Sequence, residues 1–502
     1  MLQDLILLKE FPFVVLAIFV SAIGGTFQYG LGISGVTPPS VYIKDLVNQT
    51  CIQRYDVYLQ QWQLSLIWSF IVSIYAIGGL LGSILAVPCV SKVGRRNCLI
   101  LNNFVAIAGA VLLISSRTAS SFEMLFVGRF LYGVNAGIGL SAHLLYITEC
   151  APKMLKGMVG VTIATAVTVG RFTGQLLGLR ELLGTEDRWP WLLGFNAFFA
   201  LLQLITLPFL PESPKFLLLN RGDRQACEKA LLRLWGNKDH STEVEEILKE
   251  KMALQNVRSR SVMELFREKS VRWQLATASI TYFSLQLSGM NAVYFYSYDV
   301  FRAAGIPENQ IPYASLGMGT CEMLSSVLCF LIIQKMGKKV LLLAGYATTS
   351  VIFIILTITL YFQHYAIWLS YCSMVLIFAF LFTYSAGPTG VIAPLPSLIF
   401  TQAFKASATA VCAAINWLGL FIVGMLFPVL VENLQSFCFL IFLSVCVGSG
   451  LFVYFSVPEM RNKTALEIAA DFDLMHNKSR RSNVENREEQ PSNVSSIYST
   501  KF

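Results

Sequence analysis

The sequence predicts an all-α membrane protein with 12 transmembrane helices arranged as two six-helix halves. Three observations support this prediction. The 502 residues are 55% apolar and only 14% charged, whereas soluble proteins average about 25% charged residues. Twelve apolar runs are long enough for a bilayer-spanning helix, which needs roughly 20 residues. Charged motifs that follow the early runs recur in the same order after the later runs.

The apolar runs fall into two sets of six. The first set lies near residues 11–32, 64–87, 98–115, 123–147, 157–179 and 190–210, and the second near 273–300, 312–334, 340–361, 366–396, 406–430 and 436–457. Pro388, Pro394 and Pro396 interrupt the tenth run. The predicted organisation is therefore a first half at 1–210, a helical cytoplasmic linker at 211–271, a second half at 272–457 and a largely disordered tail at 458–502.

The distribution of basic residues predicts the orientation in the membrane. With the N-terminus in the cytoplasm, 30 of the 38 Lys and Arg residues fall in inner segments and six in outer loops. Both termini are therefore predicted to be cytoplasmic, and the net charge of +8 reflects topology, not nucleic-acid binding. Asn48 begins a glycosylation sequon in the first outer loop, so we expect a glycoprotein of the plasma membrane.

Three pairs of motifs indicate an internal duplication. Gly94-Arg95-Arg96 and Gly337-Lys338-Lys339 are separated by 243 residues, and the Pro-Glu pairs at 211 and 458 by 247. Lys156 and Lys405 are 249 residues apart. Two related six-helix units are the architecture of the major facilitator superfamily.

Eight motifs, which occur in one order along the chain, carry a more specific resemblance. They are Phe27-Gln28-Tyr29-Gly30, Gly94-Arg95-Arg96, Gly128-Arg129, Glu149-Cys150-Ala151-Pro152-Lys153, Pro211-Glu212-Ser213-Pro214-Lys215, Gln286-Leu287-Ser288-Gly289 with Asn291, Asn416-Trp417 and Pro458-Glu459. With them the chain resembles the animal facilitative hexose transporters, a sugar-porter branch of that superfamily. Gly178-Leu179-Arg180-Glu181 is most similar to the fructose and urate subgroup.

The resemblance implies a cytoplasmic gate of ion pairs that form when the carrier faces outward and break when it opens inward. The gating candidates are Arg95, Arg96, Glu149, Lys156, Arg129 and Lys405. The alternative is that these charges only determine topology. Leu398 stands in the second half where Glu149 stands in the first, which predicts a weaker gate there.

The resemblance also implies a sugar site. Its candidate residues are Gln286, Asn291, Asn416, Trp417, Thr168, Arg171, Glu322 and Tyr384. Amides and an aromatic wall suit a neutral polyol, although the same amides could instead only join helices. Gln286 and Asn291 are five residues apart, so on one continuous helix they would flank one face at roughly 140°.

The predicted site departs from the family pattern. Leu285, Ala164 and Leu420 replace amides, and Ala393 replaces a tryptophan that would narrow the pocket. Only about half of the glucose-type amide set is present. Tyr384 takes the place of a histidine of a fructose-selective relative.

Arg171 and Glu322 are charges within predicted spans, which are costly and usually functional. Thr168, Arg171 and Gln175 share one helical stripe with Ala164. Three interpretations are open. The two charges pair across the cavity; or Arg171 meets an anionic substrate while Glu322 titrates; or one side chain snorkels or the register is off by one residue.

The predicted function is facilitative transport of a small polar solute, fructose or a related hexose, by alternating access. Proton-coupled sugar porters have an acid in the first span where this chain has Gly32, which favours a uniporter. The alternatives are a carrier of a non-sugar or anionic solute such as urate, and a transport-deficient sensor or scaffold. No residue cluster suggests an enzyme, a cofactor or a metal, and the expected partners are the solute and the lipid bilayer.

Overall fold

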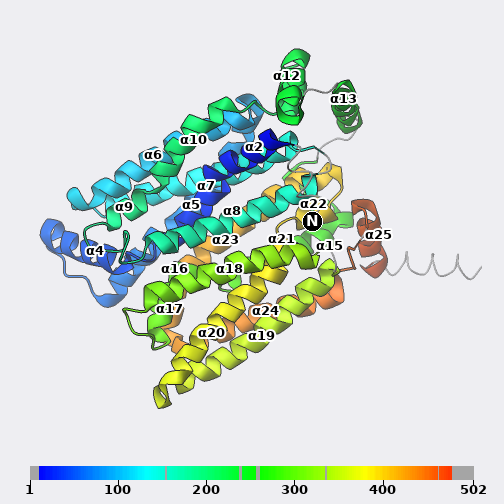
Figure 1. The fold of residues 1–502 in the computed structure, drawn as a ribbon. Coiled ribbons are helices and arrows are strands. Elements are labelled where there is room, and N and C mark those ends of the chain that lie inside the picture. Colours follow the sequence, from blue (N-terminus) through cyan, green and yellow to red (C-terminus); the bar gives the residue numbers. More distant parts are fainter. Residues whose placement is uncertain are drawn as a thin grey trace, which may run out of the picture.

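The computed structural model describes residues 11–152, 155–236, 240–255, 260–333, 336–461 and 463–476. Within these ranges the chain is helical and has no strand. The long helices run side by side in one bundle, with α4 (Ser40–Tyr55) and α17 (Ser297–Ala303) at one end and α12 (Arg224–Trp235) and α25 (Ala465–His476) at the other (Figure 1). We call these the outer and inner ends, following the orientation predicted from the Lys and Arg distribution.

The first half crosses the bundle six times. Its first passage breaks at Gly24-Gly25, and its sixth breaks at Phe195. The passages are α2 (Pro12–Ile23) with α3 (Thr26–Ser34), α5 (Gln61–Lys92), α6 (Arg95–Thr118), α7 (Glu123–Cys150), α8 (Lys156–Leu177), and α9 (Trp189–Gly194) with α10 (Asn196–Thr206) and η2 (Leu207–Phe209).

The second half repeats the pattern. The tenth passage of the bundle, the fourth of this half, opens into a π-helical turn, Ser385–Thr389, at Pro388. The turn forms there because proline removes a backbone donor from the helix. The passages are α15 (Arg272–Leu287) with α16 (Met290–Phe295) and α17, α18 (Ile311–Ile333), α19 (Lys338–Phe362), α20 (Ile367–Tyr384) with η5 (Ser385–Thr389), α21 (Gly390–Ile392) and α22 (Leu395–Ile399), α23 (Gln402–Leu434) and α24 (Cys438–Ser456).

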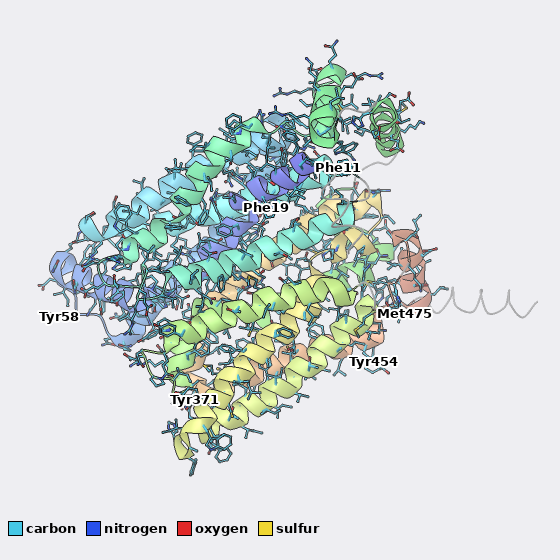
Figure 2. All side chains as sticks on the ribbon, viewed as in Figure 1. Phe11, Phe19, Tyr58, Tyr371, Tyr454 and Met475 are labelled. Atoms are coloured by element: carbon cyan, nitrogen blue, oxygen red, sulfur yellow. The ribbon has the colours of Figure 1, made fainter. Side chains whose placement is uncertain are left out.

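The predicted fold class is confirmed. Eight segments of the described chain are long and apolar enough to cross a membrane, and one of them, Gln402–Ser456, contains two passages. Large apolar side chains such as Phe19 and Tyr454 are exposed on the outside of the bundle, where lipid would cover them (Figure 2). The middle segment is helical as predicted, and its helices are α11 (Pro214–Leu219), α12, α13 (Ser241–Gln255) and α14 (Val262–Arg267).

Glycine allows α5 and α7 to approach closely. A Cβ atom on Gly133 of α7 would lie 2.0 Å from the carbonyl oxygen of Tyr75 on α5. Small residues are typical of such contacts because lipid gives no hydrophobic drive for helix association, so close backbone packing must supply it.

The two halves contact each other from the outer end to the middle of the bundle. Ser65 donates a hydrogen bond of 2.6 Å to Glu432 near the outer end. In the outer loops Glu181 accepts a hydrogen bond from Tyr313, which lowers the pKa of the Glu181 carboxyl. Further inward, Trp417 on α23 donates to Ser83 on α5 at 2.8 Å.

The close approach of α5 and α7 predicts a size limit at Gly133. We expect Gly133→Ala to reduce the melting temperature of the purified protein and its surface expression, because overpacking typically costs about 1–3 kcal/mol. The matched control is Gly448→Ala in α24, where a Cβ atom would meet nothing within 4 Å. Equal stability of the two variants would contradict this account of the packing.

Candidate functional site

A continuous chain of hydrogen bonds crosses the middle of the bundle. Arg171 on α8 donates to Glu322 on α18 at 2.5 Å and to Asn291 on α16 at 2.9 Å. Asn291 donates to Gln286 at 2.7 Å, and Gln286 donates to Asn416 on α23 at 2.6 Å. We call these five residues the central polar chain. It joins the first half to the second through four predicted site residues of the second half.

The charged end of the central polar chain is deeply buried. Arg171 is 5% exposed and Glu322 is 2% exposed. The second oxygen of Glu322 accepts a hydrogen bond from Tyr294, and the Arg171 guanidinium lies 4.7 Å from the centre of the Tyr294 ring. The structure contains the ion pair that one of the three open interpretations describes, and neither side chain snorkels, since both are buried. A buried pair of opposite charges avoids the large cost of an isolated ion.

A helix break explains why Gln286 and Asn291 bond to each other. Residues on a single helix at this spacing would have flanked one face, as predicted. Instead α15 ends at Leu287, Gly289 takes a positive φ of 84°, and α16 begins at Met290. Glycine tolerates this left-handed conformation, and the break redirects α16 so that the two amides meet. The angle of roughly 140° between the two amides does not apply, because it assumed a continuous helix.

Trp417 forms an aromatic wall beside the chain. It is buried, and its ring packs edge-on against Tyr29 at 5.8 Å and against Tyr75 at 6.3 Å. Asn416, the residue before it, holds the uncharged end of the chain through Gln286. The described structure thus places Asn416 and Trp417 next to each other on α23 but with different partners.

Besides Trp417, two predicted site residues do not join the chain. Thr168 lies one turn inward of Arg171 on α8, with its hydroxyl 3.3 Å from that of Ser326. Tyr384 is fully buried, and its hydroxyl donates to the backbone carbonyl of Ser284 at 3.1 Å. The sequence analysis missed Tyr294, whose hydroxyl donates to Glu322, and no local pattern near Asn291 signals this contact.

At the inner end, Arg95 and Glu149 form an ion pair of 2.9 Å. Ser213 also donates to Glu149, and the neighbouring Glu212 accepts from the backbone amides of Arg95 and Arg96 at 3.0 and 2.9 Å. Glu212 therefore caps the first turn of α6, where a negative charge is favourable. The Arg95–Glu149 pair is formed within the first half and ties α6 to α7.

The other gating candidates have different settings. Lys405 lies half-buried at the start of α23. The side chain of Lys156 lies outside the described residues, so its predicted pairing stays a prediction. The sequon residue Asn48 is half-buried in α4, with Thr50 donating to the carbonyl of Ser120 at 3.4 Å, and its glycosylation also stays a prediction.

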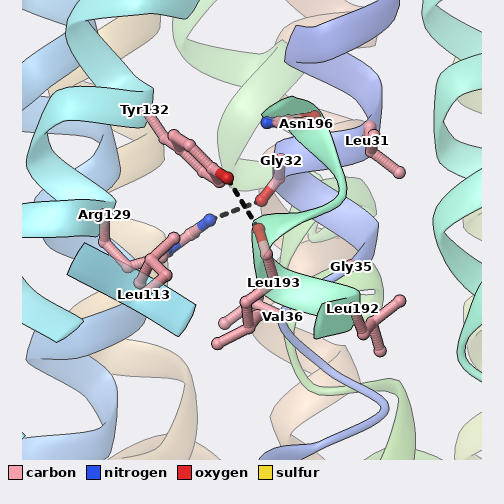
Figure 3. Close-up of a pocket in the computed structure, with 10 residues that line it drawn as sticks. All are labelled: Leu31, Gly32, Gly35, Val36, Leu113, Arg129, Tyr132, Leu192, Leu193 and Asn196. Atoms are coloured by element: carbon pink, nitrogen blue, oxygen red, sulfur yellow. Dashed lines mark hydrogen bonds between the residues drawn. The ribbon is translucent and has the colours of Figure 1, made fainter. Parts of the chain in front are cut away.

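Arg129 lies near the outer end of α7, far along the helix from Glu149 at the inner end. Its guanidinium donates to the carbonyl of Gly32 at 2.5 Å (Figure 3) and also to that of Val72 at 3.3 Å. It also lies 4.6 Å from the centre of the Tyr75 ring. Arg129 thus joins α3, α5 and α7 within the first half, beside a small pocket, and has no direct contact with the inner ion pair.

Twelve passages in two halves, with a buried polar chain between them, define a membrane carrier of the major facilitator type. A family model described as "Sugar (and other) transporter" matches residues 17–472. The chain belongs to this family of transporters, which confirms the resemblance drawn from its motifs.

The chain is similar to several curated proteins over most of its length. It is 41% identical to facilitated glucose transporter member 9 of solute carrier family 2 from Mus musculus, over 92% of this chain and 86% of that protein. It is 39% identical to human member 11 (92% and 93% covered) and 36% identical to human member 5 (92% and 92%). The inward-open structure of the xylose transporter XylE from E. coli shares the fold, with a TM-score of 0.76 at 20% identity and 91% and 99% coverage.

The ion pair predicts non-additive effects of substitution. Arg171→Leu and Glu322→Gln should each reduce folding or transport strongly, because breaking one side of a buried pair costs about 3–5 kcal/mol. The double variant should recover part of the loss, since no unpaired charge is left. A double-mutant cycle on surface expression and uptake measures this coupling.

Additive losses in the cycle would show that the two charges do not stabilise each other. A selective loss of anion uptake in Arg171→Leu, with normal expression and no recovery in the double variant, would instead support the anionic-substrate interpretation.

Proposed function

We propose that this protein is a facilitative carrier, a uniporter that moves a small polar solute, fructose or a related hexose, by alternating access. The observation that carries this proposal is the central polar chain. Its amides lie between the two halves, beside the Trp417 wall, and offer donors and acceptors suited to the hydroxyl groups of a neutral polyol. Membership of the sugar transporter family supports the same assignment.

The hydrogen-bond partner of Arg129 at Gly32 supports transport without a proton gradient. Proton-coupled porters have an acid where this chain has Gly32, and here the Arg129 guanidinium donates to the backbone carbonyl of Gly32. A carbonyl group does not titrate, so this arginine has no protonatable partner at that position. The remaining acid in the spans, Glu322, is held by Arg171 and Tyr294.

In this structure Ser65 bonds to Glu432 across the halves at the outer end, and the Arg95–Glu149 pair at the inner end is formed as well. Ala164 on α8 and Ala393 in the tenth passage are exposed, and each is smaller than the side chain of the family pattern. Tyr282 donates to the carbonyl of Ala393 at 2.9 Å, at a position where the family has a tryptophan. The absence of a large ring there favours an open path from the central polar chain to the inner end.

A specific observation favours a second candidate substrate. The Nε–H of Arg171 is buried without a hydrogen-bond acceptor, so this guanidinium has spare capacity for an anion. A planar monoanion such as urate is therefore the alternative solute, and a transport-deficient sensor is the remaining alternative. We also propose a plasma-membrane location with cytoplasmic termini and glycosylation at Asn48, in agreement with the distribution of basic residues.

Uptake into proteoliposomes tests the proposed function. Purified protein should equilibrate a labelled hexose, fructose first, across the membrane at equal pH on both sides. A panel of hexoses, polyols and urate identifies the solute. Concentrative uptake only under an imposed proton gradient would refute uniport, and no uptake of any solute in the panel would favour the sensor.

The amides provide a second test of the site. Asn291→Ala and Gln286→Ala should each reduce hexose transport by roughly 5- to 150-fold, because an unsatisfied buried hydrogen-bonding group costs about 1–3 kcal/mol. Surface expression measured in parallel separates a folding defect from a binding defect. Normal transport by both variants at full expression would show that the sugar site lies elsewhere.

A further inference from the structure

The amides of the central polar chain are already bonded within the protein. The carbonyl oxygen of Asn291 accepts from Arg171, and its amide nitrogen donates to Gln286. The amide nitrogen of Gln286 in turn donates to Asn416. A hexose that binds these groups must therefore replace protein–protein hydrogen bonds, not only displace water.

Arg171 makes the contact that a sugar hydroxyl would make. It reaches Asn291 from α8 in the first half, whereas Asn291 belongs to the second half. A substrate bound between the halves would join them in the same way. The guanidinium N–H and a sugar O–H are both hydrogen-bond donors. The oxygen of Asn291 has two lone pairs, and the one that Arg171 uses is open to a sugar only when the guanidinium moves.

We propose that Arg171 is a built-in occupant of the sugar site and sets its affinity for neutral hexoses. This inference rests on the proposed function. Glu322 and Tyr294 hold the guanidinium in place, and a hexose binds only after Arg171 has moved off Asn291. Arg171 is therefore a specificity-determining residue that lowers the affinity for a neutral polyol.

The geometry of arginine is necessary for this role. Its planar fork sends one N–H group to Glu322 and another to Asn291. A lysine is a single point charge without two separated arms, so it satisfies Glu322 but does not reproduce both bonds. The Arg171→Lys substitution thus keeps the charge balance of the buried pair and releases the acceptor of Asn291.

The same arrangement has a kinetic consequence. In a carrier whose two halves are joined only by the bound substrate, the loaded form changes between the outward- and inward-facing states faster than the empty form. Here Arg171 of the first half bonds to Glu322 and Asn291 of the second half without any substrate. The empty carrier should therefore change between the two states about as fast as the loaded one. Net uptake and exchange should then have similar maximal rates.

The test compares Arg171→Lys with the matched control Arg180→Lys, an exposed arginine in the loop that follows α8. Proteoliposome uptake of labelled hexose is measured as net flux and as exchange. For Arg171→Lys we expect the half-saturating concentration to fall roughly 2- to 10-fold, the gain from one released hydrogen-bond acceptor. Exchange should become faster than net uptake, and the control should match the unmodified protein in both measurements.

An unchanged or higher half-saturating concentration in a folded Arg171→Lys protein would overturn the inference. If that variant does not fold, the double variant Arg171→Met with Glu322→Gln, which leaves no buried charge, should show the same fall, and its absence would overturn the inference equally. Failure of the proposed function is distinguishable, because the unmodified protein would then neither transport a hexose nor show quenching of tryptophan fluorescence on hexose addition.

Discussion

The constraint on which the site depends is that a charged side chain in the middle of a membrane must be neutralised. Arg171 and Glu322 come from different halves of the molecule and satisfy this constraint together. An ion pair in a low-dielectric interior is strong only when its remaining groups are also bonded, and Tyr294 and Asn291 supply those bonds. The pair therefore fixes the spacing of α8 and α18 and, through Asn291, the conformation of the amides.

At their inner ends the two halves share a contact between a glutamate and a glycine, but only the first half has a second carboxylate beside it. In the first half Glu212 lies against Gly94, and in the second half Glu459 lies against Gly337, as the duplication predicts. In the first half a second carboxylate, Glu149, pairs with Arg95. The second half has Leu398 at that position. Lys339, which matches Arg96 in the repeat, donates to the backbone carbonyl of Tyr454 at 3.0 Å, as Arg96 donates to that of Leu210 at 2.8 Å. The difference between the halves is therefore the carboxylate of Glu149, and its absence at Leu398 is what predicts a weaker inner gate in the second half.

Sequence reasoning reached the passages and the polar residues because composition and motif order report them directly. It could not give the directions of side chains that depend on a broken helix. The bond between Gln286 and Asn291 follows from the positive φ at Gly289, a conformation that a glycine in a span permits but does not require. The position of Arg129 near the outer end follows from its register on α7, whereas the motif alone placed it with the gate. The role of Tyr294 depends on where α18 places Glu322, which no local pattern in α16 reveals.

Arg171 only donates, to Glu322 and to Asn291, whereas Asn291 and Gln286 each accept one bond and donate the next. Hydrogen bonds linked in this way polarise one another, so the bond from Arg171 strengthens the bonds that follow it from Asn291 to Asn416. Substrate selectivity is consequently a property of the whole chain. The loss of amides at Leu285, Ala164 and Leu420 removes separate contacts, but the addition of Arg171 changes what the retained amides offer. The affinity of this site for a neutral sugar therefore does not follow from how many amides it retains. The oxygen of the retained Asn291 already accepts a hydrogen bond from Arg171.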